Sequence, residues 1–435
     1  MRISFLVLFC MLFFHAVSQS DEIALERALY NLPNVSFKKI SEPGETYLKY
    51  SLLIKQPVDH LTPSKGFFNQ RVILLHKGFN NPTVMETQGY ALPDRDRNEV
   101  EKLLDANYLN IEYRFNGKSV PDSMAWKYLT QEQATADLHN INVLFRNIYH
   151  GKWISTGISK GGSTTIYYKY FFPADVDLAI PYVAPLDNSL EDKRLYTFLD
   201  TVGSTDCRNK IKEFQIFLLK HKNEAIEKLK WYSKGAKLHY EYTGSIGKSF
   251  EYAVLEYPYG FWQYYKVNGC DSVPTNKVLD DYLEYLIQTD NISLFADEGI
   301  KKYEAHYYQA ATQSGYYGYN IAPFKKYLHY FQENGSAAFP PKIANVKSID
   351  ISLNRKVQKW LDESGNNIIY IYGSVDVWTA AGIIPTDKVN AKSFLLSNKN
   401  HSTARVKNMD GVMQKDFVQV VESMIGIHAN LEALQ

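Results

Sequence analysis

One short segment of the chain has the composition of a turn that carries a nucleophile. Residues 156–162 read Thr-Gly-Ile-Ser-Lys-Gly-Gly, so Ser159 stands between glycines placed two residues to either side. Glycines at these positions let a strand and a helix cross closely around a Ser held in a strained backbone conformation. The hydroxyl then projects above the sheet, and the backbone N–H of Lys160 points toward an oxyanion. The pattern predicts acyl-transfer chemistry, with an ordinary glycine-rich turn as the alternative.

A Ser hydroxyl is a weak nucleophile near neutral pH, so it needs a base and a group that orients the base. Asp376 and His401 each follow a late apolar run, which gives the chain order Ser, acid, His. His401 would take the hydroxyl proton, and Asp376 would hold the other imidazole N–H and stabilise the imidazolium. We therefore predict a catalytic triad of Ser159, Asp376 and His401. Asp387, which stands farther from its strand end, is the alternative acid.

A hydrolase of this kind also needs a second oxyanion donor, in a loop after an early central strand. The apolar run 70–75 leads directly into a turn that contains Gly78 and Phe79. We predict that the backbone of these two residues supplies the donor, on the basis of position alone. The alternative is a plain glycine turn after a strand.

The elements around these residues alternate between strand and helix, which is typical of a parallel sheet covered by helices on both faces. The sequence therefore predicts the α/β class. The expected strands are 47–58, 70–75, 108–113, 153–155, 176–184, 367–372 and 392–397. The expected helices are 100–105, 130–148, 163–172 and 417–431, and residues 21–45 are expected to form a polar strap.

The character of the sequence changes between about residues 190 and 340. Charged helical segments replace strands there, and 19 of the 33 Tyr lie between Tyr196 and Tyr330. We predict a helical, Tyr-rich cap over 191–340, inserted into a core formed by 21–190 and 341–435. The aromatic clusters either line a substrate pocket as a lid or form the core of the cap itself.

The first residues have the pattern of a secretory signal peptide. Arg2 precedes an apolar run over 3–14, and the small residues Ala16 and Ser18 follow it. The run is short for a membrane span, and no later stretch approaches ~20 apolar residues. We predict a signal peptide over 1–20, export to the periplasm or the extracellular space, and no stable membrane insertion.

The composition of the chain indicates which classes of binding partner to expect. The chain has 48 basic and 47 acidic residues without a block of like charge, so no nucleic-acid partner is expected. No metal-ligand pattern is present, and we predict no metal and no cofactor. Cys207 and Cys270 remain after the signal and form either one disulfide or two free thiols. The oligomeric state is not predicted.

Several segments resemble the secreted prolyl tripeptidyl-aminopeptidase family of serine peptidases. The chain is similar, more distantly, to the prolyl carboxypeptidase and dipeptidyl-peptidase II family. The likeness covers most of the mature chain and is weaker in the insertion. The segments that carry it are 72–82, 112–119, 128–134, 157–162, 172–177, 182–185, Gly373-x-x-Asp376-x-Trp378 and Asn400-His401.

This resemblance implies an α/β-hydrolase core with a helical cap, the triad named above, and release of short peptides from free N-termini, often after Pro. Such an enzyme must bind the substrate ammonium, best with a buried carboxylate. Glu86, Asp187 and Asp271 are the candidates. Two alternatives stay open, which are an esterase or lipase on the same triad and a binding protein on a hydrolase scaffold.

Overall fold

Nine strands form one sheet in the computed structural model, in the order β1-β2-β3-β5-β4-β6-β7-β8-β9. The structure describes residues 20–41, 45, 47–93, 97–122, 125–264, 269–289, 291–331 and 336–434. Residues 1–19 of the predicted signal peptide lie outside this part of the chain. The sheet is mostly parallel and is combined with helices, and a turn that contains Ser159 joins strand β6 to helix α4. These features confirm the predicted α/β-hydrolase class.

The chain divides into two compact units. Unit 1 comprises Met1–Gly157, Thr164–Ile180 and Gly411–Gln435, and unit 2 comprises Ile158–Ser163 and Pro181–Asp410. This division by compactness differs from the predicted segments, because the predicted cap shares unit 2 with two strands of the sheet.

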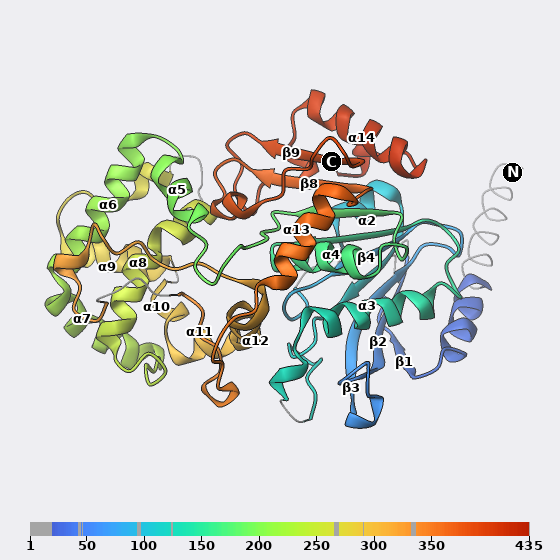
Figure 1. Ribbon diagram of the computed structural model, residues 1–435, viewed down its shortest axis with the longest axis horizontal. Coiled ribbons are helices and arrows are strands. Elements are labelled where there is room, and N and C mark those ends of the chain that lie inside the picture. Colours follow the sequence, from blue (N-terminus) through green and yellow to red (C-terminus); the bar gives the residue numbers. More distant parts are fainter. Residues whose placement is uncertain are drawn as a thin grey trace, which may run out of the picture. The chain divides into compact units, whose positions relative to one another are not determined.

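Unit 1 contains the first six strands, which Figure 1 shows in blue to green. Tyr50, Leu52 and Ile54 alternate with more exposed residues along β2, as expected for a strand with one buried face. Strands β4 and β5 are buried at every position, which is typical of central parallel strands. The bounds are β1 Val35–Lys39, β2 Leu48–Pro57, β3 Phe67–His76, β4 Thr83–Thr87, β5 Asn107–Ile111 and β6 Trp153–Ile158.

Strand direction decides which loops share an edge of this sheet. The pairs β1–β2, β2–β3 and β3–β5 are antiparallel, whereas β4 is parallel to both β5 and β6. Leu75 near the end of β3 pairs with Tyr108 near the start of β5. The carboxyl ends of β4, β5 and β6 therefore lie at one edge, and that of β3 lies at the opposite edge.

Two helices of unit 1, α2 and α3, follow residues whose side chains cap them. Asn98 Oδ1 accepts from Val100 N at 2.8 Å, and Thr130 Oγ1 accepts from Gln133 N at 3.3 Å. Residues 20–30 form a helix and β1 follows, so the prediction of a polar strap over 21–45 is wrong. The helix bounds are α2 Glu99–Leu104, α3 Gln131–Phe145, α4 Lys160–Phe171 and α14 Gly411–Ile425.

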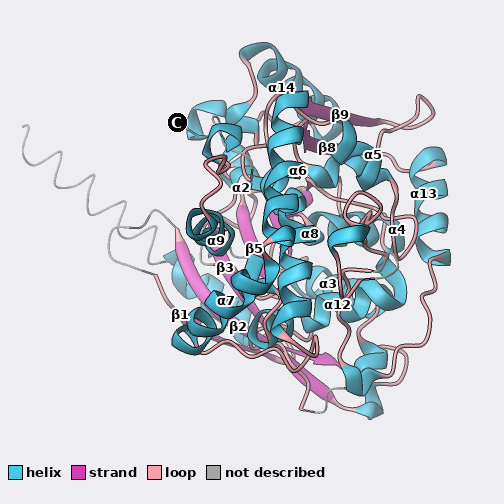
Figure 2. Cartoon of the chain, turned by 90° about the vertical axis from the view of Figure 1, so that its left-hand side faces the viewer, coloured by secondary structure: helices cyan, strands magenta, loops and turns pink. Residues whose placement is uncertain are grey.

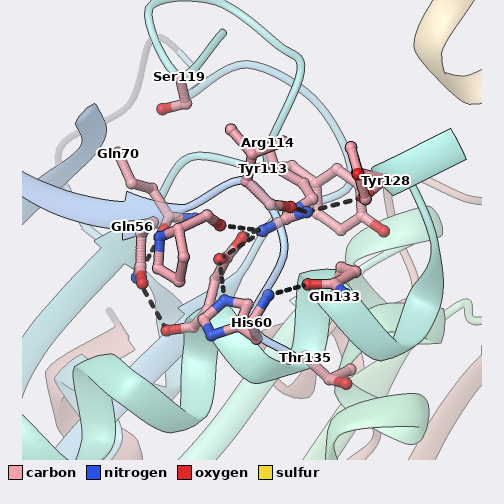
Figure 3. A network of polar contacts seen from close by, with 12 residues as sticks. Gln56, His60, Gln70, Tyr113, Arg114, Ser119, Tyr128, Gln133 and Thr135 are labelled. Carbon is pink, nitrogen blue, oxygen red and sulfur yellow. Dashed lines mark hydrogen bonds and ion pairs between the residues drawn. The ribbon is translucent and has the colours of Figure 1, made fainter. Parts of the chain in front are cut away.

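A buried ion pair ties several segments of unit 1 together (Figure 3). Arg114 donates from Nε and Nη2 to the two carboxylate oxygens of Asp137, at 2.7 and 2.8 Å. His60 Nε2 lies 2.7 Å from Asp137 Oδ1. The remaining guanidinium bonds go to the carbonyl oxygens of Pro57, Val58 and Tyr128. Arg114 and Asp137 are both 0% exposed, so these two charges neutralise each other inside the protein.

Unit 2 contains the helical cap. Figure 2 shows its helices in cyan, and α6, α7 and α9 pack against the long helix α8. A disulfide joins Cys207 in α6 to Cys270, which settles the alternative left open by the sequence. The bounds are α5 Arg194–Thr201, α6 Thr205–Lys220, α7 Lys222–Ala236, α8 Ile246–Tyr264, α9 Leu279–Gln288, α10 Asn291–Leu294, α11 Asp297–Lys302 and α12 Glu304–Gln309.

The aromatic residues of the cap mainly form its own core, which was the alternative to a lid that lines a pocket. Tyr252 and Phe331 meet edge to face, with ring centroids 4.4 Å apart. Tyr259 stacks on Tyr317 at 4.6 Å. The buried cluster also includes Phe214, Tyr257, Phe261, Trp262, Tyr282, Tyr307 and Tyr319.

Helix α8 tolerates a proline in its interior because a neighbour satisfies the backbone. Pro258 has no N–H to donate to Val254 O, four residues earlier. Gln215 Nε2 of α6 donates to that oxygen instead, at 2.8 Å. The helix can therefore continue to Tyr264 without a buried, unpaired carbonyl.

The last strands of the sheet complete unit 2. Strand β8, Ile368–Gly373, is buried throughout and pairs in parallel with β9, Ala391–Leu396. Helix α13, Ser352–Glu363, precedes β8, and β7, Leu178–Tyr182, follows α4 along the chain. Of the helices that the structure describes, none has the length and apolar character needed to cross a membrane.

Candidate active site

Ser159 occupies the turn between β6 and α4. Its φ is +60°, in the left-handed region that non-glycine residues rarely adopt. Its N–H donates to Tyr182 O at 2.9 Å, and its carbonyl accepts from Ser163 N at 2.9 Å. The hydroxyl of Ser163 donates to Pro185 O at 2.7 Å. The strained turn is therefore held by the end of β7, by the residues that follow it and by the first turn of α4.

Asp376 and His401 contact each other directly. His401 Nδ1 lies 2.8 Å from Asp376 Oδ2, and the two residues are 6% and 0% exposed. Asp376 Oδ1 accepts from Trp378 N at 3.2 Å. A carboxylate at Nδ1 fixes that nitrogen as the N–H donor, so Nε2 is the nitrogen able to accept a proton. Asp387, the alternative acid, is exposed.

A close crossing of two chain segments brings these side chains together. A Cβ on Gly373, the last residue of β8, would lie 2.2 Å from Lys399 O, so a larger residue would push the segments apart. Val375 N donates to the same oxygen at 3.2 Å. Because β8 and β9 are parallel neighbours, the acid after β8 and the His after β9 leave the sheet at the same edge.

The loop of His401 is held by its own residues and by the cap. Asn400 Oδ1 accepts from the backbone N–H groups of Ser402 and Thr403, at 3.0 and 2.9 Å. His401 N donates to Gln263 O in the last turn of α8 at 3.1 Å. The final carbonyls of a helix lack internal partners, so this bond also caps α8. The Tyr264 ring stands edge-on to the imidazole, with centroids 6.4 Å apart.

Lys160, directly after Ser159, has a buried side chain. Burial lowers the pKa of its ammonium group to about 7. Burial also lowers the pKa of His306 well below its usual range, and the nearby Lys160 charge adds to this effect. The surroundings next to Ser159 therefore favour the uncharged forms of both basic groups.

The prediction that Gly78 and Phe79 hold the oxyanion is wrong. They follow β3, which runs antiparallel to β5, and Gly78 N donates to Asn107 Oδ1 at the start of β5. Phe79 O accepts from His150 N, just before β6. Ser159 follows the other end of β6, whose six residues span ~20 Å.

A strand that the sequence analysis missed explains this error. Strand β4 lies beside β6 and runs parallel to it, with Glu86 opposite Thr156. Within unit 1, the loop that begins at Gln88 therefore leaves the sheet at the edge where β6 ends. The short sequence Thr83–Thr87 is polar at both ends and has no clear alternation, so its pattern did not indicate a strand.

The three predicted ammonium-binding acids lie in different surroundings. Glu86 is buried within β4 and accepts a hydrogen bond from the Tyr108 hydroxyl. Asp271 is largely exposed and lies 3.7 Å from Lys210 Nζ. Asp187 follows β7 and is buried. Burial, together with the negative charge of Asp192, raises its pKa well above the usual range.

The structure adds an acid that the sequence analysis did not single out. Glu256 lies on α8, is 5% exposed, and accepts hydrogen bonds from Tyr317 and Tyr319 at 2.8 and 2.7 Å. The signal was present in the sequence, because Glu256 interrupts an otherwise apolar and aromatic run.

Solved structures with the same general architecture include a proline iminopeptidase from Mycobacterium smegmatis and an acetyl xylan esterase from Thermoanaerobacterium sp. JW/SL YS485. The first is 11% identical with a TM-score of 0.40, and the match covers 86% of this chain and 97% of that chain. The second is 10% identical with a TM-score of 0.35, and the match covers 92% of each chain. Likenesses of this size do not bear on activity.

Sequence relatives are more informative. A prolyl tri/tetrapeptidyl aminopeptidase from Streptomyces mobaraensis is 33% identical over 363 residues, which cover 81% of this chain and 74% of that protein. The sequence model of the PS-10 peptidase S37 family matches residues 19–416. The chain is therefore a serine peptidase and belongs to the PS-10 peptidase S37 family.

Proposed function

We propose that this peptidase releases short peptides, chiefly tripeptides, from free N-termini by an acyl-enzyme mechanism at Ser159, His401 and Asp376. The main support for the triad is the 2.8 Å contact between His401 Nδ1 and Asp376 Oδ2. The two residues follow the adjacent parallel strands β9 and β8. The φ of +60° at Ser159 supports the role of nucleophile, because this strain is typical of a nucleophile turn.

The proposed steps follow from these contacts. Nε2 of His401 takes the Ser159 proton as Oγ attacks the scissile carbonyl, and the oxyanion forms near the backbone N–H of Lys160. The imidazolium, stabilised by Asp376, gives its proton to the leaving amine as the C–N bond breaks. Water then attacks the acyl carbonyl with His401 again as the base. The bond between that carbon and Ser159 Oγ breaks, the imidazolium returns its proton to Oγ, and the peptide leaves with a new carboxylate.

The substrate class is supported by the relative from Streptomyces mobaraensis, whose name specifies prolyl tri- and tetrapeptide release. We extend this preference to the present chain. The helical cap supports an exopeptidase, because helices around an active site can exclude the middle of a folded protein.

Export is part of the same proposal. The N-terminal pattern of residues 1–20 supports a secretory signal. The disulfide between Cys207 and Cys270 fits an oxidising compartment, the periplasm or the extracellular space.

The test compares the signal-free protein with its Ser159→Ala variant on p-nitroanilides of Ala-Ala-Pro and Ala-Pro, each with a free and an acetylated amine. We expect the wild type to cleave the free-amine tripeptide preferentially. The variant should lose at least ~10⁴-fold in kcat, because the nucleophile is absent.

Other outcomes would replace the proposal. Equal cleavage of free and acetylated substrates would indicate an endopeptidase. Hydrolysis of short esters alone would indicate an esterase. Undiminished amide hydrolysis by Ser159→Ala would show that another residue is the nucleophile.

A further inference from the structure

Two buried glutamates on α8 differ in how their charge is compensated. Glu251 accepts from the backbone N–H groups of His329 and Tyr330, at 2.7 and 2.9 Å, and lies 3.3 Å from Lys222 Nζ. Five residues later, and among the residues that the structure describes, the side chain of Glu256 has only the hydroxyls of Tyr317 and Tyr319 as hydrogen-bond donors. Over the described ranges of the chain, Glu256 has no ion pair with any Lys, Arg or His.

The residues around Glu256 are fixed in place. Tyr259 stacks on the Tyr317 ring at 4.6 Å, and its hydroxyl donates to Gly318 O at 2.7 Å. Both hydroxyls that reach Glu256 therefore come from one short segment that the same tyrosine anchors. We call Glu256, Tyr259, Tyr317 and Tyr319 the carboxylate box. A preorganised box of this kind holds a charge for which the protein supplies no cation.

One aromatic layer connects the carboxylate box with the triad. The Tyr317 ring contacts Trp378 edge to face, with centroids 5.1 Å apart. The N–H of Trp378 donates to Asp376 Oδ1, the other carboxylate oxygen of the triad acid. All of these residues belong to unit 2. The box is therefore adjacent to the catalytic loop.

Helix α8 sets the separation between the box and the base. Gln263, whose carbonyl accepts from His401 N, lies seven residues after Glu256. Seven residues are two helical turns, so the two positions share a face, and the rise between them is ~10.5 Å. Three extended residues of a substrate span ~10–11 Å. The distance along the helix thus matches the length of a tripeptide.

We propose that Glu256 binds the free α-ammonium group of the third residue before the scissile bond, and that α8 thereby selects tripeptides. This inference rests on the proposed function. The ammonium would complete the missing ion pair, with the two tyrosine hydroxyls holding the carboxylate in position.

The ionisation of Glu256 agrees with this role. Burial raises the pKa of its carboxyl to about 7, and the two tyrosine hydrogen bonds only partly offset that effect. An arriving ammonium favours the charged carboxylate. Asp187, another buried acid, is influenced by the charges of Asp192 and Arg194, so a local cation already acts on it.

The first test measures kcat/KM for free and N-acetylated Ala-Ala-Pro p-nitroanilide. We expect the preference of the wild type for the free amine to fall about 10- to 100-fold in Glu256→Gln, as for loss of a hydrogen bond between charged groups. Glu251→Gln is the matched control, because it changes a buried glutamate of the same helix. It should leave the preference for the free amine unchanged.

Substrates of different length test whether the distance along α8 between Glu256 and Gln263 selects tripeptides. The wild type should prefer Ala-Ala-Pro over Ala-Pro and Ala-Ala-Ala-Pro, and Glu256→Gln should reduce this discrimination. If Ser159→Ala is inactive but Glu256→Gln keeps the wild-type preferences for amine and length, the inference fails and the proposed function stands. If no free-amine amide is cleaved by the wild type, the proposed function itself fails.

A binding measurement covers the case in which Glu256→Gln does not fold. Ser159→Ala is titrated with Ala-Ala-Pro amide at pH 6 by calorimetry in two buffers of different ionisation enthalpy. Binding of the free amine should release a proton from Glu256, whereas the acetylated ligand should release none. Equal proton release with both ligands would overturn the inference.

Discussion

Two buried groups of charges in this peptidase differ in how completely they are paired. In unit 1, the guanidinium of Arg114 is neutralised by Asp137 and bonded to three carbonyl oxygens (Figure 3). In unit 2, the carboxylate of Glu256 has two neutral hydroxyls and no cation among the described residues. Removing one partner from a fully paired site should destabilise the fold, whereas we propose that an incompletely paired carboxylate is available to a cationic ligand.

The largest effect is expected from breaking the buried pair of Arg114 and Asp137. Arg114→Ala leaves Asp137 buried beside only His60, so the free energy of unfolding should fall by about 3–5 kcal/mol. Lys152→Ala is the control, because it breaks the partly exposed pair with Asp177 and should cost about 1 kcal/mol or less. Urea unfolding measures both. Equal losses would show that pairing at Arg114 is not structural.

Ionisation of Glu256 should lower the stability of the folded protein. The Glu256 carboxyl has a pKa of about 7 in the fold against a usual value of 4.5, and the groups that face it are the neutral phenols Tyr259, Tyr317 and Tyr319. Between pH 4.5 and 7 the unfolded chain loses this proton while the folded protein keeps it. The free energy of unfolding should therefore fall as pH rises through this window.

Glu256→Gln should remove this part of the pH dependence. Urea unfolding of both proteins at pH 5 and pH 8 measures it. The wild type should lose more stability between these values than the variant does. The same loss of stability in both proteins would mean that Glu256 is not the group that titrates. It would also remove the evidence that the charge of Glu256 is less well compensated than that of Arg114.

The smallest effect is expected at the hydroxyls of the carboxylate box. Tyr319→Phe removes one of the two donors to Glu256 while keeping the ring. The preference for a free-amine substrate should fall about 2- to 10-fold, as for loss of one neutral hydrogen bond. Tyr257→Phe is the control, because its hydroxyl bonds to Tyr285 instead. Equal effects in the two variants would contradict a specific role for Tyr319.

Structural features that depend on local sequence patterns were the ones predicted most accurately. Apolar runs located β8 and β9, and the order of Ser159, Asp376 and His401 after strand ends predicted a contact that the structure contains in part, between the acid and the base. Periodicity could not locate β4, because five residues with polar ends carry no clear repeat. Without β4, the direction of β3 was misjudged, and Gly78 was assigned to the wrong edge.

Other features depend on packing between segments far apart in the chain. Glu256 and Tyr317 are separated by 61 residues, so nothing in either local sequence indicates that they meet. The role of the rings in the cap core depends on contacts of the same kind. Strand periodicity fixes which face a residue occupies, but it does not fix which distant residue faces it.

The hydrogen bond between His401 N and Gln263 O has a consequence for inactivation. His401, the proposed general base, is bonded to the final turn of a cap helix, and helix ends fray before helix centres. Local melting of that turn would release the imidazole from its position while the sheet stays intact. We therefore expect heating to abolish activity at a lower temperature than the one at which the sheet unfolds.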